Sequence, residues 1–111
     1  MAKPKRLVYR AIARRDIERA IDHYLAEDAD SAALGFVDEL ERATGELAVH
    51  PRLGPTRYAH ELQLPDVRSW MVKRFPFVVF YVEQGDHIDI WRVLHAENDV
   101  PRWLKEPAEG R

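Results

Sequence analysis

Phe77-Val78-Val79-Phe80-Tyr81-Val82 decides the fold, because this stretch is apolar at every position. A strand with one solvated face alternates apolar and polar residues, so the unbroken run predicts a central strand covered on both faces. Strand-forming runs flank it at Val67–Lys73 and His87–His95, beyond Phe75-Pro76 on one side and Glu83-Gln84-Gly85-Asp86 on the other. Together the three runs predict an antiparallel meander.

The first half of the chain predicts one strand and two helices. Leu7–Ile12 is rich in strand formers, whereas apolar residues from Ile17 to Leu25 recur at helical spacing. A second helix is expected after Asp30 and Ser31, which can cap it, and it ends at His50-Pro51. Helices so close in sequence form an antiparallel hairpin that needs a sheet to cover its apolar stripe.

The expected fold is therefore α+β, in the order β-α-α-β-β-β, with a helical hairpin packed on a small antiparallel sheet. Its length fits one domain spanning residues 1–111, with an ordered core at about residues 6–104. The ends, Met1–Lys5 and Lys105–Arg111, are expected to be frayed.

The composition excludes several classes of protein. Hydrophobic residues make up 46% and charged residues 32%, as in ordinary globular proteins, and the net charge of −2 is too near neutral for a surface that tracks a phosphate backbone throughout. The charge is polarised, because Lys3–Arg19 is rich in bases and Glu27–Glu46 in acids. Without cysteine there is no disulfide or thiolate site, and without a signal peptide or membrane span a cytoplasmic location is expected.

No recognisable catalytic, metal or cofactor motif stands out. The glycines are isolated, so no phosphate-binding loop is expected, and neither Ser31 nor Ser69 lies in a nucleophile elbow. The histidines lack metal-ligand spacing, which argues against a zinc site; they are His23, His50, His60, His87 and His95. We therefore expect no catalytic residue, no metal and no cofactor.

The end of the chain is more specific. Arg92-Val93-Leu94-His95 is followed by a short polar turn, Asp99 and Val100-Pro101, and this run resembles the signature end of the RelE/ParE family of bacterial toxins. The preceding Arg74–Tyr81 is similar to the hairpin that enters that signature. The family fold, a strand, a helical hairpin and an antiparallel sheet, would cover residues 7–104.

The resemblance implies a toxin of a type II toxin–antitoxin system. RelE-like members cut messenger RNA on the ribosome, whereas ParE-like members bind and poison DNA gyrase. Phe77 stands where the nuclease branch would have an arginine, and Trp103 where it would have a tyrosine, which favours the ParE-like branch. Asn98 departs from that branch, which often has an arginine before the residue that is Asp99 here.

The expected partners follow from this resemblance. They are a ParD-like antitoxin, bound in a hetero-oligomer that contacts DNA only through the antitoxin, and DNA gyrase as the target. Two alternatives stay open. One is a ribosome-dependent mRNA endonuclease that recruits Lys73, Arg74, Arg92 and His95, and the other is a non-toxic partner-binding module.

The candidate site residues form two groups. Target binding is assigned to Arg68, Arg74, Arg92 and His95, and a basic patch on the sheet could form from Arg68, Lys73, Arg74 and Arg92. The structural alternatives are edge protection, an internal ion pair of Arg92 with Asp99 or Asp66, and a hydrogen bond from His95 to the following turn. Partner binding is assigned to Trp70, Trp91 and Trp103, of which at least one is expected to serve only the core.

Overall fold

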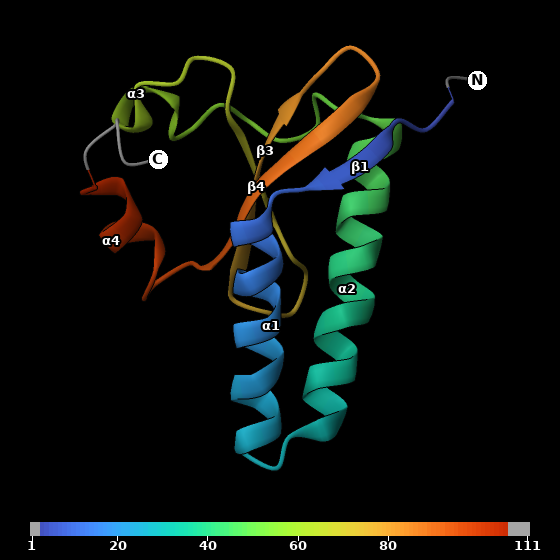
Figure 1. Ribbon diagram of the computed structural model, residues 1–111, viewed down its shortest axis with the longest axis vertical. Helices are drawn as coiled ribbons and strands as arrows, with labels where there is room; N and C mark the ends of the chain where they lie inside the picture. The colour runs from blue at the N-terminus through green and yellow to red at the C-terminus, as the bar shows by residue number, and fades with distance from the viewer. Residues whose placement is uncertain (1–2, 107–111) are drawn as a thin grey trace.

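The predicted order of elements is confirmed in a computed structural model that describes residues 3–106 (Figure 1). Two short helices, α3 and α4, are added to it. The elements are β1 (Arg6–Tyr9), α1 (Ala11–Ala26), α2 (Asp30–Val49), α3 (Ala59–Leu62), β2 (Arg68–Met71), β3 (Phe77–Glu83), β4 (His87–His95) and α4 (Val100–Leu104). The fold class is thus α+β, as expected.

The four strands lie in the order β1-β4-β3-β2. β2, β3 and β4 form the predicted antiparallel meander, whereas β1 pairs with β4 in parallel, so the whole sheet is mixed. The predicted first strand was too long, because α1 already begins at Ala11. The backbone N–H of Arg10 donates to the carbonyl of Ile90 at 3.0 Å, which is the last contact before the chain turns into the helix.

Both faces of the sheet are covered, which confirms the interpretation of the apolar run in β3. The helical hairpin α1–α2 packs on one face, where Phe36 and Leu47 join a cluster with Val79 and Tyr81. On the opposite face α3, α4 and the loop before β2 cover the sheet. That second cluster comprises Leu62, Val67, Val78, Phe80, Leu94, Val100 and Trp103.

A β-bulge in β4 changes which side chains face the hairpin. Tyr81 pairs with Ile90 and Phe80 pairs with Arg92, so Trp91 is an extra residue on β4. Before the bulge Ile90 packs under the hairpin, whereas after it Leu94 packs on the opposite face. Strict alternation along β4 predicts that Arg92 shares a face with both Ile90 and Leu94, and the bulge makes this prediction wrong for Ile90.

Tyr81 fixes the loop that runs beside β2. Its hydroxyl accepts a hydrogen bond from Gly54 N at 2.9 Å and donates one to the Pro51 carbonyl at 2.8 Å. A Cβ atom at Gly54 would lie 2.5 Å from the Ser69 carbonyl oxygen, so only glycine fits this approach. The loop is thereby held tightly against the sheet edge.

The ends of the described chain are tied down. Lys5, expected to be frayed, donates its backbone N–H to the Ala48 carbonyl at 2.9 Å and its Nζ to Glu83 at 2.8 Å. Lys105 and Glu106 donate backbone hydrogen bonds to carbonyls of α4. The other residues of the expected frayed ends include 1–2 and 107–111, which lie outside the described residues.

Candidate functional site

The free edge of β2 is the first feature of a binding site. β2 is the outermost strand of the sheet. In the β2–β3 ladder alternate residues hydrogen-bond to β3, as Val72 N does to the Phe77 carbonyl. Ser69 and Met71 are the residues between, so their backbone groups point outward. Pro55 takes up one of these groups, because its carbonyl accepts a hydrogen bond from Ser69 N at 3.0 Å. Met71, whose side chain is 53% exposed, is the outward position next to it.

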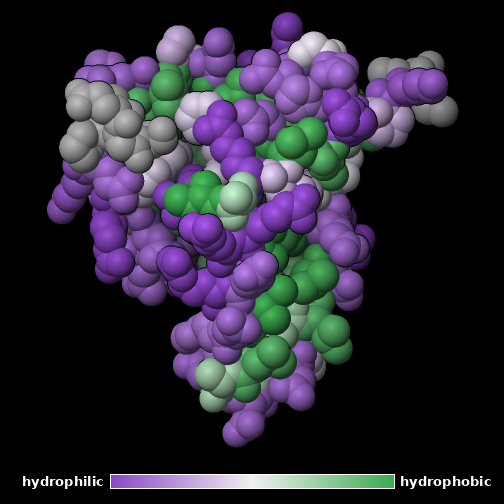
Figure 2. All heavy atoms as spheres, viewed as in Figure 1, coloured by the Kyte–Doolittle hydropathy of each residue, from purple (hydrophilic) through white to green (hydrophobic). Residues whose placement is uncertain are grey.

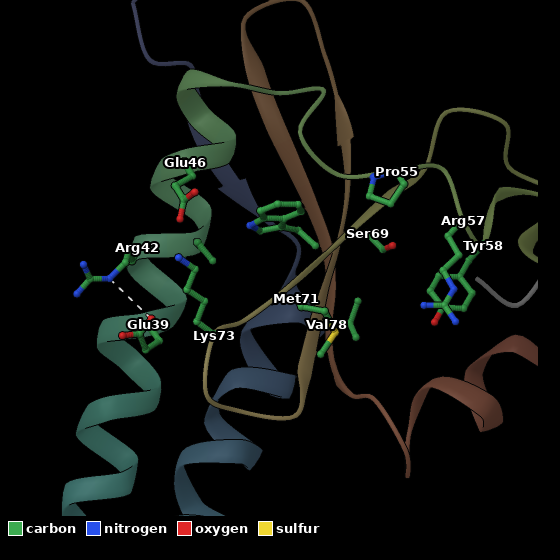
Figure 3. A pocket seen from close by; sticks show the side chains of 12 residues that line it. Glu39, Arg42, Glu46, Pro55, Arg57, Tyr58, Ser69, Met71, Lys73 and Val78 are labelled. Carbon is green, nitrogen blue, oxygen red and sulfur yellow. Dashed lines mark ion pairs between the residues drawn. The ribbon is translucent and has the colours of Figure 1, made fainter.

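An apolar groove of about 350 Å³ runs along this edge (Figure 3). Figure 3 shows Glu39, Arg42 and Glu46 on α2 at one side, and Arg57 and Tyr58 at the other, with β2 between them. The lining residues are Glu39, Arg42, Ala43, Glu46, Pro55, Arg57, Tyr58, Ser69, Trp70, Met71, Lys73 and Val78. Apolar lining beside an open strand edge suits an extended peptide that adds a strand and inserts alternate side chains.

Arg68 and Arg74 lie in different environments. Arg68 is half-buried and donates from Nη1 to the Gly54 carbonyl at 2.8 Å, so it supports the loop beside the groove. Arg74 is exposed at the β2–β3 turn, where its φ of 69° is uncommon for a residue with a side chain. The turn is anchored by the Phe75 ring, whose centroid lies 5.9 Å from those of Tyr24 and Phe36.

Arg92 is engaged within the protein. Its Nε and Nη2 atoms donate to the two carboxylate oxygens of Asp16 at 2.8 and 3.0 Å, and the side chains are only 14% and 2% exposed. The structural alternative, an internal ion pair, holds for Arg92, but the candidate partners Asp99 and Asp66 were wrong because the partner is Asp16. The guanidinium also lies 5.6 Å from the centre of the Trp103 ring. Arg92 therefore offers little free charge to a ligand.

His95 shapes the turn after β4, as its structural interpretation predicted. Its Nδ1 accepts hydrogen bonds from the backbone N–H groups of Glu97 and Asn98 at 3.2 and 3.1 Å. The carboxylate of Asp99 in turn accepts from His95 N at 3.3 Å. With Nδ1 as acceptor, the ring proton of the neutral histidine lies on Nε2.

The three tryptophans have three environments. Trp70 is half-buried and lines the groove. Trp91 lies under the Arg10 guanidinium at 4.2 Å and donates from Nε1 to Asp89 at 3.0 Å. Trp103 is 4% exposed and packs on Phe80 with ring centroids 4.7 Å apart, which confirms that at least one tryptophan serves the core.

The residues that a nuclease would recruit do not line one pocket. Lys73 lines the groove beside β2, whereas Arg92 and His95 border two depressions that share Arg19 and Asp99. The shifted pKa values belong to structural contacts: burial raises the pKa of Tyr81, and the Lys5 hydrogen bond lowers the pKa of Glu83.

Within residues 3–106 no three histidine or acidic side chains gather into a metal site. Across the same residues, no helix has the length and apolar character needed to cross a bilayer.

Asp16 and the loop before β2 are the parts of the site that the sequence analysis missed. Asp16 carries a detectable signal, because it shares helical spacing with the buried Ala13 and Ala20 and a carboxylate at a core position needs a partner. Pro55 and Tyr58 carry no such signal in the sequence, because their position beside β2 depends on the hydroxyl of Tyr81, a residue distant along the chain.

These features define a small α+β protein with an open sheet edge and an apolar groove, in which Arg68, Arg92 and His95 are held in internal contacts. The family model described as the ParE toxin of the type II toxin–antitoxin system parDE matches residues 7–100. The chain belongs to this family and is a ParE toxin of a type II toxin–antitoxin system.

A solved structure has the same fold. It is described as the chromosomal ParDE toxin–antitoxin system from P. aeruginosa, and it aligns with a TM-score of 0.70 at 23% sequence identity. The alignment covers 84% of this chain and 97% of that one. No match was found among curated proteins.

Proposed function

We propose that this toxin acts by binding DNA gyrase, without cutting a substrate of its own, and that a ParD-like antitoxin neutralises it. One observation carries the proposal: Asp16 neutralises Arg92, the arginine of the signature strand, whereas the groove beside β2 is accessible. A metal-free nuclease needs cations and a proton carrier around one reacting phosphate. Of the side chains that could serve, Arg92 is paired with Asp16 and Lys73 lines the groove beside β2, and α4 packs over the sheet face beside Arg92.

The antitoxin is proposed to occupy the β2 edge. An extended antitoxin segment would pair with the outward backbone groups of Met71 as a fifth strand. Its apolar side chains would enter the groove at Trp70 on β2 and Val78 on β3, which belong to clusters on opposite faces of the sheet. A disordered segment can cover a large surface in this way, and the complex would be a hetero-oligomer that contacts DNA through the antitoxin.

For the target, family membership favours gyrase. Of the four residues assigned to target binding, Arg74 is the one that the structure leaves exposed, at a turn anchored by the Phe75 ring, so we retain it as a target contact. Gyrase acts on the chromosome, which agrees with the expected cytoplasmic location. Inhibition by binding predicts a stoichiometric dependence on the toxin.

Controlled expression in a bacterium tests the proposal. We expect growth arrest with induction of the DNA-damage response, relief of both by the co-expressed antitoxin, and inhibition of purified gyrase at toxin concentrations comparable to the enzyme. Abrupt arrest of translation, together with trimming of ribosome-bound message by the purified protein, would establish the endonuclease alternative. Normal growth with tight antitoxin binding would establish the non-toxic module.

A further inference from the structure

The distal part of the helical hairpin is strongly acidic. From Glu18 to Glu41 the chain carries eight carboxylates and a single arginine, Arg19, a net charge of −7 with histidine neutral. The rest of the protein then carries +5, because the whole chain carries −2. Figure 1 shows that the turn joining α1 and α2 lies at the end of the molecule away from the strands. The negative charge therefore projects from the body of the toxin.

An apolar seam runs along the same hairpin. A groove of about 300 Å³ between the helices is lined by Ile17, Ile21 and Val37 among others. Leu25 follows Ile21 by one turn and is 47% exposed, and Leu34 precedes Val37 by one turn and is 69% exposed. Figure 2 shows this seam as green atoms along the hairpin, bordered by purple ones.

The acids along the seam are unpaired. Glu18 and Glu41 line the groove, and Asp22 and Asp38 lie one turn from them on the same helices. Among the described residues, no basic side chain lies within 4.0 Å of these four carboxylates. Arg14, the cation at the groove, lies toward Tyr9 instead, 5.7 Å from the centre of its ring.

We infer that this acidic, apolar hairpin is the surface by which the toxin engages its target, and that it docks on a basic amphipathic surface of the target protein. Exposed leucines supply contact area, and the surrounding carboxylates select a partner rich in lysine and arginine. A second copy of this chain would present the same acidic rim, so like charges disfavour self-association through the seam. The inference rests on the proposed function only in that the toxin acts by binding a protein.

This assignment separates two tasks on one small molecule. The antitoxin edge at Met71 belongs to β2, the outermost strand, whereas Leu25 and Leu34 flank the turn that joins α1 to α2. An enzyme that handles DNA must present positive surface to the phosphate backbone, and such a surface is the electrostatic complement of a hairpin carrying −7. Attraction of this kind speeds encounter and weakens as salt rises.

Paired variants test the inference. The double variant Leu25→Gln, Leu34→Gln removes the exposed apolar surface, and glutamine remains a good helix former. Its control is Leu53→Gln, at a position that lies outside the hairpin and is 39% exposed. The double variant Asp38→Lys, Glu41→Lys reverses the charge at two of the acidic positions along the seam. Its control is Asp66→Lys, at an exposed position outside the hairpin. Circular dichroism and urea unfolding verify that each variant folds. The measurements are growth arrest, affinity for purified gyrase, affinity for the purified antitoxin, and molar mass by light scattering.

We expect both hairpin variants to lose growth arrest and to bind the target at least about tenfold more weakly. They should keep wild-type antitoxin affinity and mass, and the controls should match the wild type. If the wild type does not bind gyrase but the hairpin variants still lose growth arrest, the gyrase assignment fails and this inference stands. Unchanged arrest by the hairpin variants overturns it, as does lost antitoxin affinity or a dimer that the variants dissociate. A wild type that neither arrests growth nor binds gyrase overturns the proposed function and this inference together.

Discussion

Asp16 Oδ2 accepts hydrogen bonds from both Arg92 Nε, at 2.8 Å, and the backbone N–H of Val93, at 3.1 Å. β1 pairs with β4 only as far as Ile90, so beyond that point no strand of the described residues 3–106 lies against this edge of β4. A helix side chain takes the place of the missing strand. The same carboxylate neutralises Arg92 in the Arg92–His95 run by which the chain resembles the family. This ion pair therefore also stabilises the sheet.

We predict that breaking this pair strongly destabilises the toxin. Asp16→Ala should lower the free energy of unfolding by about 3–5 kcal/mol, because it leaves a buried guanidinium and an amide without their acceptor. Asp16→Leu combined with Arg92→Met should recover a large part of that loss, since no uncompensated charge remains. Urea unfolding of the two variants measures the difference, and equal losses in both would contradict the account.

The role of Arg92 in toxicity is a separate prediction. If it acts through the fold alone, Arg92→Met with Asp16→Leu should still arrest growth once the folded fraction is matched to the wild type. Growth curves at equal levels of folded protein measure this. Loss of arrest from this well-folded pair would instead return Arg92 to the target contacts.

Local sequence pattern predicted most of the fold. The apolar run at Phe77–Val82 gave a strand buried on both faces, and helical periodicity gave the hairpin, because both signals are repeated over many residues. The bulge at Trp91 could not be foreseen, since a single inserted residue leaves no periodic trace and is set by pairing with Tyr81. The same inserted residue takes Arg92 off the face of Ile90, where strict alternation along the strand would have placed it.

The groove was harder to predict than the fold. Trp70 was selected because tryptophan is common at interfaces, and it does line the groove. Its neighbours Pro55 and Tyr58 belong to a loop whose position depends on contacts with Tyr81, a residue distant in sequence. Non-local hydrogen bonds of this kind leave no mark in local composition.

Gly54→Ala should damage the groove without touching its lining. The new methyl carbon would lie 2.5 Å from the Ser69 carbonyl and 2.8 Å from the Tyr81 hydroxyl, so the loop must move away from β2. We expect antitoxin affinity to fall and the free energy of unfolding to drop by roughly 1–3 kcal/mol. Gly85→Ala, where the added Cβ meets nothing within 4 Å, is the matched control. Calorimetric titration with antitoxin measures the affinity, and equal affinity in both variants would contradict this role of the loop.

The Tyr81 hydroxyl should make stability sensitive to alkaline pH. Burial raises the pKa of Tyr81 above its ordinary value of 10.0, so folding favours the neutral phenol. Its stabilising contribution is complete below the ordinary pKa and is lost as pH rises through the higher folded-state pKa. At neutral pH, Tyr81→Phe should be less stable than the wild type by about 1–2 kcal/mol, because two hydrogen bonds are lost. The difference in unfolding free energy should shrink above about pH 10. A difference that stays constant with pH would show that the phenol does not titrate on unfolding.

Met71→Pro should separate toxicity from neutralisation. Because the backbone N–H of Met71 points away from β3, proline at this position leaves the β2–β3 ladder intact and removes a donor that a fifth strand would need. We expect wild-type growth arrest, wild-type binding to gyrase, and antitoxin affinity reduced by about tenfold or more, so that co-expressed antitoxin no longer rescues growth. Met71→Leu keeps the donor and the apolar side chain and should be rescued normally. Full rescue of Met71→Pro would mean that the antitoxin binds without pairing to this strand, and the groove would then have to accept its side chains by packing alone.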